Sequence, residues 1–326
     1  MEQMISSFSV LLLVNVLVEI LYFQIARKFN IVDKPNERSS HNIVTIRGGG
    51  VVFPISFIIT TLFFSEVDIL FSLCLVTLST ASFVDDIVSL NSKVRLVIQM
   101  AAVIGLLYST LTTQSWYIAI VFFILITGII NAYNFMDGIN GITVLYSLVT
   151  LASIYWVKET VQGFLSEYLF MSILSSLMVF GFLNLRKKAL CFSGDVGSIS
   201  LAFIFCFLLI KMVLLTNFGW WILFLGIYGI DTVFTIICRI FRKESILQAH
   251  RSHFYQYLAN EAGLTHIQVS LLYAIAQLSL NAIVIYSYYN NQMWPALISL
   301  FLFLSIYIIF RLRFEGYKRL FVTYLL

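Results

Sequence analysis

Residues 116–157, WYIAIVFFILITGIINAYNFMDGINGITVLYSLVTLASIYWV, decide the fold class of this chain. An apolar segment at 116–132 is followed by a short polar cluster and then by a second apolar segment at 139–157. Apolar segments of roughly 20 residues have the length of a helix that crosses a bilayer. Because neither segment alternates apolar and polar residues as a barrel strand does, both are predicted to be membrane-spanning helices.

Similar apolar segments, separated by polar residues, occur along the rest of the sequence. Of its 326 residues, 60% are hydrophobic and 11% are charged, whereas roughly 25% of the residues of a soluble domain are charged. This composition excludes a water-soluble globule and a disordered chain. The chain is therefore predicted to be an all-α, polytopic integral membrane protein with about eleven transmembrane helices. The predicted segments are 5–26, 48–64, 67–84, 94–111, 116–132, 139–157, 164–183, 198–215, 220–238, 267–289 and 294–310.

The placement of the basic residues predicts the orientation. Of the 20 Lys and Arg residues, all but Lys158 and Lys211 fall on one side of the predicted helices. Cytoplasmic loops collect Lys and Arg, so the N-terminus is expected outside and the C-terminus in the cytoplasm. The five tryptophans all fall at the opposite, external ends of the segments, as an interfacial belt would.

Two adjacent carboxylates, Asp85 and Asp86, end the third segment on the predicted cytoplasmic side. They repel each other and meet the negative end of the helix dipole, so the pair calls for a cation. Neighbours on a helix point about 100° apart, which allows the two acids different tasks. The alternative is a solvated helix end that Lys93 and Arg95 neutralise.

A second polar cluster, residues 131–141, lies between the two segments quoted first. Its carboxamides Asn131, Asn134 and Asn140 and its carboxylate Asp137 offer oxygen and amide partners to a hard metal ion or a polar ligand. Such a cluster is often only a turn. Its position at membrane level favours a functional role.

A third cluster, residues 191–198, runs directly into the eighth segment. Glycines before a helix, with a serine near its cap, are typical of an anion-binding helix start. Asp195 beside such a site is suited to Mg²⁺, which takes its other ligands from phosphate and water. A plain Gly-Asp turn is the alternative.

The longest polar stretch, residues 239–266, contains His250, Arg251 and His253. A zinc site is disfavoured because no Cys or acidic partner lies nearby at ligand spacing. Hydrogen bonding to phosphate or sugar is the preferred interpretation. Inside the ninth segment, Asp231 is expected to pair with an Asn, a Lys or a metal-bound water.

Taken in order, these clusters resemble the polyprenyl-phosphate N-acetylhexosamine-1-phosphate transferases, of the glycosyltransferase family 4 type. The matching stretches are 33–36, 38–41, 47–50, 85–86, 131–141, 192–198 and 250–253. The resemblance covers about residues 31–257 of one multispan domain, 1–326, and leaves two C-terminal transmembrane helices in 258–326. The His-Arg-Ser-His form at 250–253 resembles the branch that initiates O-antigen and capsule synthesis.

The resemblance implies transfer of N-acetylhexosamine 1-phosphate from a UDP-sugar to a polyprenyl phosphate, such as undecaprenyl phosphate, with release of UMP. It implies a multi-pass protein of the bacterial inner membrane that needs Mg²⁺, with Mn²⁺ as a substitute. The resemblance implies no nucleic-acid partner and is compatible with a homodimer. The competing hypothesis is a multispan transporter with acidic coupling residues.

The same resemblance implies roles for individual residues. Asp85 and Asp86 match a catalytic acidic pair, one of which would deprotonate the lipid phosphate. Asp195 and Asp137 match metal-binding positions. The expected substrate contacts are Asn131, Asn134, Asn140, Phe192, His250, Arg251, His253, Arg38 and His41.

Overall fold

The computed structural model describes residues 2–35, 40, 43–64, 68–111, 116–245 and 251–322. The predicted segments 48–64 and 220–238 each include a 3₁₀ turn. Every predicted apolar segment overlaps one of the longer helices. These helices are α1 (Glu2–Lys28), α2 (Val52–Phe64), α3 (Ile69–Val88), α4 (Ser92–Thr110), α5 (Trp116–Met136), α6 (Ile142–Val157), α7 (Glu167–Asn184), α8 (Gly194–Thr216), α9 (Gly226–Phe241), α11 (His266–Tyr289) and α12 (Trp294–Phe314). The shorter elements are two helices, α10 (Phe254–Asn260) and α13 (Tyr317–Phe321), and two 3₁₀ turns, η1 (Gly49–Val51) and η2 (Gly219–Leu225).

The all-α membrane architecture is confirmed. Within the described part of the chain, 9 helices are long and apolar enough to cross a membrane. Two further apolar helices, Gly49–Phe64 and Ile142–Val157, are shorter than the others. At 1.5 Å per residue, the 13 residues of α2 extend over about 20 Å, less than the roughly 30 Å of a bilayer core.

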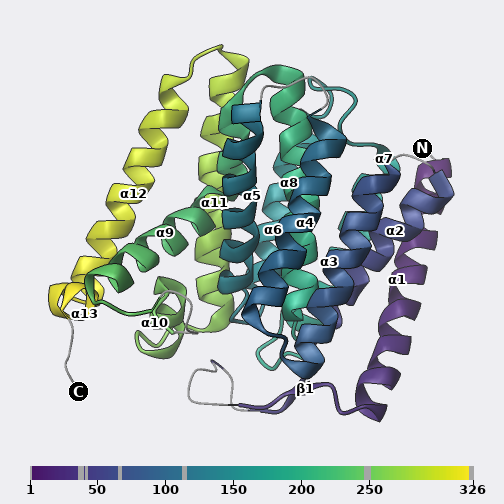
Figure 1. Cartoon of the computed structure of the whole chain (residues 1–326), viewed down its shortest axis with the longest axis horizontal. Helices are drawn as coiled ribbons and strands as arrows, with labels where there is room; N and C mark the ends of the chain where they lie inside the picture. Colours follow the sequence, from purple (N-terminus) through teal and green to yellow (C-terminus); the bar gives the residue numbers. More distant parts are fainter. Residues whose placement is uncertain are drawn as a thin grey trace.

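The helices form one bundle, with α1 at one edge and α12 at the opposite edge (Figure 1). Helix α8 is buried along most of its length and packs against α3 and α5, which explains why it is apolar all round. Both edge helices are only 17% buried and expose many large apolar side chains. Such a surface suits lipid and would be unfavourable in water.

The first and last helices begin and end at opposite ends of the bundle. Helix α1 starts at the upper end in Figure 1, whereas α12 finishes at the lower end beside α13. An odd number of crossings would give this arrangement, in agreement with the predicted orientation, which itself stays a prediction.

The tryptophans differ from the expected belt at one position. Trp116, Trp156 and Trp294 are strongly exposed at helix ends, as a membrane-interface residue should be. Trp221 is instead fully buried, and its indole nitrogen donates to the Thr216 hydroxyl. The aromatic pattern alone does not reveal that η2 turns this side chain into the protein.

A small irregular layer closes the lower end of the bundle. Strands β1 (Val32–Asp33) and β2 (Thr45–Ile46) pair antiparallel, with Val32 opposite Ile46. The Ile46 carbonyl then accepts from the amide of Phe192 (2.8 Å), and the Phe192 carbonyl accepts from the amide of Gly49 (2.8 Å). These bonds join the segment after α1 to the segment before α8, two of the polar clusters singled out in the sequence.

Candidate active site

A polar cavity of about 290 Å³ lies among the segments that join the helices at this end. Five of the residues expected to form the site line it: Asn134, Asp137, Asn140, Phe192 and Asp195. They come from the end of α5, the connection to α6, the segment that precedes α8 and the start of α8. The structure therefore brings the second and third sequence clusters into one cavity.

The two adjacent acids at the end of α3 point to different partners. One Asp85 oxygen accepts from Arg95 (2.6 Å) and the other accepts from the amide of Leu90 (2.6 Å). Asp86 instead pairs with Arg47 (2.7 Å). The Asp85–Arg95 pair agrees with part of the alternative interpretation, a helix end neutralised by Lys93 and Arg95, but both acids are buried and not solvated.

Asp86 also occupies the N-terminus of α8. Its two carboxylate oxygens accept from the amides of Asp195 (2.9 Å) and Val196 (3.0 Å). Gly194, at φ +73°, makes room for this contact, since a Cβ there would lie 2.5 Å from an Asp86 oxygen. The anion at this expected anion-binding helix start is thus the protein's own Asp86 carboxylate.

Asp195 lies between two guanidinium groups. Its carboxylate is 3.2 Å from Nη2 of Arg47 and 3.5 Å from Nη1 of Arg95. Burial alone would lower the pKa of Arg47, but Asp86 and Asp195 raise it above its ordinary value. Arg47 therefore stays charged and bridges the ends of α3 and α8.

Asp137 is held by the hydroxyl of Thr143, which donates to it. Burial raises the pKa of the Asp137 carboxyl to about 7, and the charges of Asp195 and Asp86 act in the same direction. A bound cation would favour the ionised form of this group. Nearby, the Asn134 amide donates to the Ser198 hydroxyl (3.1 Å).

The donor set of the cavity fits Mg²⁺. Asp137, Asp195 and Asn134 offer carboxylate and amide oxygens, which are the ligands this hard cation prefers. Across the described residues, no three His, Cys, Asp or Glu side chains gather closely enough to hold a metal ion by themselves. A cation in this cavity would thus complete its shell with phosphate and water oxygens, as Mg²⁺ commonly does.

Asn140 has a structural task in addition to lining the cavity. Its side-chain amide donates to the carbonyl of Arg186 (2.9 Å), and its backbone amide donates to Nδ1 of His266 (3.3 Å). Asn140 therefore joins the α5–α6 connection to the segment after α7 and to α11.

Other expected substrate contacts lie elsewhere. The side-chain amide of Asn131 donates to the carbonyl of Thr127 within α5 (2.7 Å). The ring of His253 is buried, and its Nδ1 contacts Asp231 (2.9 Å). Arg251 is half-buried just before α10. Three further expected contacts, Arg38, His41 and His250, lie outside the residues that the structure describes.

Several residues that line the cavity are not among the expected site residues. Asn184 accepts from the amide of Gly141 (2.7 Å) and donates to the carbonyl of Cys191 (2.9 Å), so it joins two of the polar clusters. Gln256 and His266 enter the cavity from α10 and α11. A single polar residue at a helix end gives no local signal. The sequence shows Arg47 beside three glycines, but it does not show that Arg47 bridges two carboxylates.

Comparisons with known proteins match the part of the chain that contains this site. Residues 69–213, which contain Asp86, Asp137 and Asp195, match the family model of glycosyl transferase family 4. A probable undecaprenyl-phosphate N-acetylglucosaminyl 1-phosphate transferase of Bacillus subtilis is 27% identical, over 93% of this chain and 89% of that protein. Two undecaprenyl-phosphate alpha-N-acetylglucosaminyl 1-phosphate transferases are also similar. The protein of Thermotoga maritima is 27% identical, over 78% of this chain and 83% of that protein. The protein of Escherichia coli is 26% identical, over 88% of this chain and 84% of that protein. The part of this membrane-helix bundle that contains these acids, residues 69–213, is thus similar to glycosyl transferase family 4.

Proposed function

We propose that this protein transfers N-acetylhexosamine 1-phosphate from a UDP-sugar to a polyprenyl phosphate at the cytoplasmic face of the bacterial inner membrane. The reaction releases UMP and starts a lipid-linked cell-surface glycan. The observation that carries the proposal is the cavity in which Asp137 and Asp195 lie beside Arg47, at one end of a bundle of membrane-length helices. The similar proteins are named for transfer of N-acetylglucosaminyl 1-phosphate to undecaprenyl phosphate.

The charges of the cavity suit phosphoryl transfer. This chemistry needs positioning and charge neutralisation more than covalent participation by the protein. Arg47 and Arg95, already turned toward Asp195, are placed to contact the phosphates of the donor. Asn134, Asn140 and Phe192 line the same cavity, and we assign them to the nucleotide and the sugar.

Mg²⁺ is the proposed cofactor, with Mn²⁺ as a substitute. Asp195 and Asp137 would hold it, together with oxygens of the donor pyrophosphate and water. When bound, it neutralises the charge that develops on the pyrophosphate during transfer.

One oxygen of the lipid phosphate attacks the β-phosphorus of the UDP-sugar in line. The bond between this phosphorus and the bridging oxygen breaks, and UMP leaves with that oxygen. A phosphate monoester has a second pKa near 6, so most of the acceptor is already dianionic at neutral pH. Asp85 or Asp86 would accept the remaining proton. The contacts expected from Arg38, His41, Asn131, His250, Arg251 and His253 stay predictions.

A transfer assay tests this proposal. Membranes containing the chain are incubated with radiolabelled undecaprenyl phosphate, Mg²⁺ and a panel of UDP-sugars. We expect one lipid-linked product, formed with one donor and with an equal amount of UMP, and no product from Asp195→Asn membranes. Absence of product with every donor would contradict the proposal. Uptake of UDP-sugar into proteoliposomes without UMP formation would favour the transporter.

A further inference from the structure

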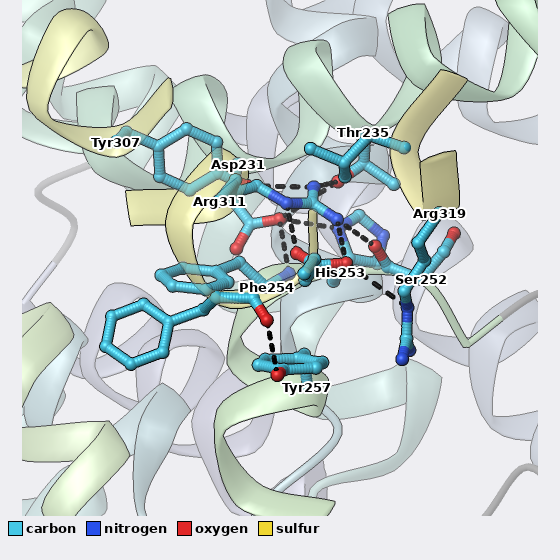
Figure 2. A network of polar contacts seen from close by, with 12 residues as sticks. Asp231, Thr235, Ser252, His253, Phe254, Tyr257, Tyr307, Arg311 and Arg319 are labelled. Atoms are coloured by element: carbon cyan, nitrogen blue, oxygen red, sulfur yellow. Dashed lines mark hydrogen bonds and ion pairs between the residues drawn. The ribbon is translucent and has the colours of Figure 1, made fainter. Parts of the chain in front are cut away.

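Arg311, in the last turn of α12, is a fully buried arginine that joins three parts of the chain (Figure 2). Its Nη1 donates to the hydroxyl of Thr235 on α9 (2.8 Å). Its Nη2 donates to the carbonyl of Ser252 (2.8 Å) and to the carboxylate of Glu315 (3.0 Å). In the sequence, Arg311 is only one of the basic residues on the predicted cytoplasmic side. A buried charge with this many partners is instead part of the internal structure.

Asp231, on α9, holds the two residues that follow Ser252. One of its oxygens contacts Nδ1 of His253 (2.9 Å) and accepts from the amide of Phe254 (3.3 Å), while Tyr273 donates to the other. The expectation of an Asn, a Lys or a metal-bound water as the partner of Asp231 is wrong. Asp231 and Arg311 together fix three consecutive residues, 252–254, at the start of α10 (Figure 2).

Helix α10 connects the fixed residues 252–254 to the cavity. Gln256, in its first turn, lines the cavity. The hydroxyl of Tyr255 donates to the carbonyl of Phe135, two residues before Asp137 (2.9 Å). This contact is tight, because a Cβ on Gly138 would lie 2.1 Å from the Tyr255 hydroxyl oxygen.

A seven-residue helix is too short to be stable without such contacts. The far end of α10 is held as well, because Glu261 pairs with Arg319 (2.6 Å). Both of these side chains are more than 40% exposed, so this pair is screened by water and holds the helix less strongly than Arg311 does.

We propose that Arg311 is a positioning residue of the transferase site. By binding the Ser252 carbonyl, Arg311 fixes the position of α10. Helix α10 in turn places Gln256 and Tyr255 against the cavity wall that contains Asp137. Helix α12 therefore contributes to a site whose proposed catalytic and metal-binding acids lie within residues 69–213, the part that matches the family model. The functional consequence rests on the proposed transfer reaction.

The substitution Arg311→Lys tests this role. A lysine ammonium is a point donor and cannot reach the Thr235 hydroxyl, the Ser252 carbonyl and the Glu315 carboxylate as a guanidinium does. We expect faster amide hydrogen exchange in α10 of the purified full chain, with exchange in α11 unchanged. We also expect the KM for the UDP-sugar to rise roughly tenfold, while the KM for polyprenyl phosphate stays within about twofold.

Two substitutions on the same side of the protein serve as comparisons. Arg313→Lys changes an exposed residue of α12 and should leave both exchange and KM as in the wild type. Arg319→Lys loosens the exposed pair with Glu261 and should have a smaller effect than Arg311→Lys.

Tyr255→Phe approaches the same helix from the cavity side and remains informative if Arg311→Lys does not fold. It should raise the KM for the donor, and the double variant should show less than the sum of the two effects because both act through α10. Wild-type donor KM in both single variants, or exchange that rises equally in α10 and α11, would overturn the positioning role. Failure of the wild-type protein to form product with any donor would instead overturn the proposed function, since the exchange measurement does not depend on turnover.

Discussion

The carboxylate of Asp86 lies 2.9 Å from the backbone nitrogen of Asp195, so the last turn of α3 caps the first turn of α8. The same carboxylate is 2.7 Å from Arg47, which also reaches the side chain of Asp195. Asp86 thus determines where the proposed metal-binding acid is placed, in addition to any part it has in proton transfer.

Asp86→Asn should therefore impair both structure and activity. Asparagine can accept only through its one oxygen, so one of the two α8 amides loses its partner. Arg47 loses one of its two carboxylate partners and keeps only Asp195. We expect product formation to fall roughly a hundredfold and the free energy of unfolding to fall by about 1–3 kcal/mol. The matched control is Asp68→Asn, because Asp68 caps the other end of α3 through the amide of Leu70 (2.7 Å). A wild-type rate in Asp86→Asn would refute this role.

Removal of divalent cations should abolish transfer. EDTA-treated membranes are expected to form no lipid-linked product, and added Mg²⁺ should restore it. Asp195→Asn should remain inactive at every Mg²⁺ concentration, because the amide carries no charge to hold the cation in a cavity that also contains Arg47. The measurement is product formation against free Mg²⁺. Turnover in EDTA would show that the acids have another function.

Gly194→Ala should be more damaging than an alanine at a comparable glycine. Gly163 has a similar φ of +87°, but a Cβ there meets no atom within 4 Å. Gly163→Ala should cost about 1–2 kcal/mol of backbone strain, which a small fall in Tm in detergent would report. Gly194→Ala adds a clash with the Asp86 carboxylate, so its Tm should fall further and its activity should fall at least tenfold. Equal effects of the two substitutions would argue against the Asp86 contact.

The orientation can be tested with single cysteines at the two ends of α7. Glu159, after α6, and Lys188, after α7, are both exposed. In intact cells, a membrane-impermeant maleimide should label Glu159→Cys and should label Lys188→Cys only after permeabilisation. The parent chain gives the background from its four native cysteines, of which Cys191, Cys206 and Cys238 are buried. The reverse labelling pattern would invert the predicted topology.

Much of the fold follows from local sequence. The length of an apolar segment and the scarcity of charge within it are properties of a few consecutive residues, and they are sufficient to locate every long helix. The acids and amides of the site also stand out locally, because each is a polar exception beside an apolar segment. Five of the expected site residues, including Asp137 and Asp195, do line one cavity.

Other relationships depend on how the helices pack. Asp86 and Asp195 are separated by more than a hundred positions, and nothing local shows that one caps the helix of the other. The same holds for Arg311, which as a residue of the sequence looks like one more cytoplasmic cation but is completely buried against the Ser252 carbonyl.

The sequence by itself therefore determined that this protein lies in a membrane, where its helices are and which of its residues carry charge. Each of these depends on the free energy of moving a short segment from water to lipid, which is a sum over neighbouring residues. Only the tertiary structure decided which carboxylates face the cavity and which make structural contacts between helices. A hydrogen bond or ion pair forms only when two groups lie within about 3 Å, and that distance is set by packing of the whole bundle.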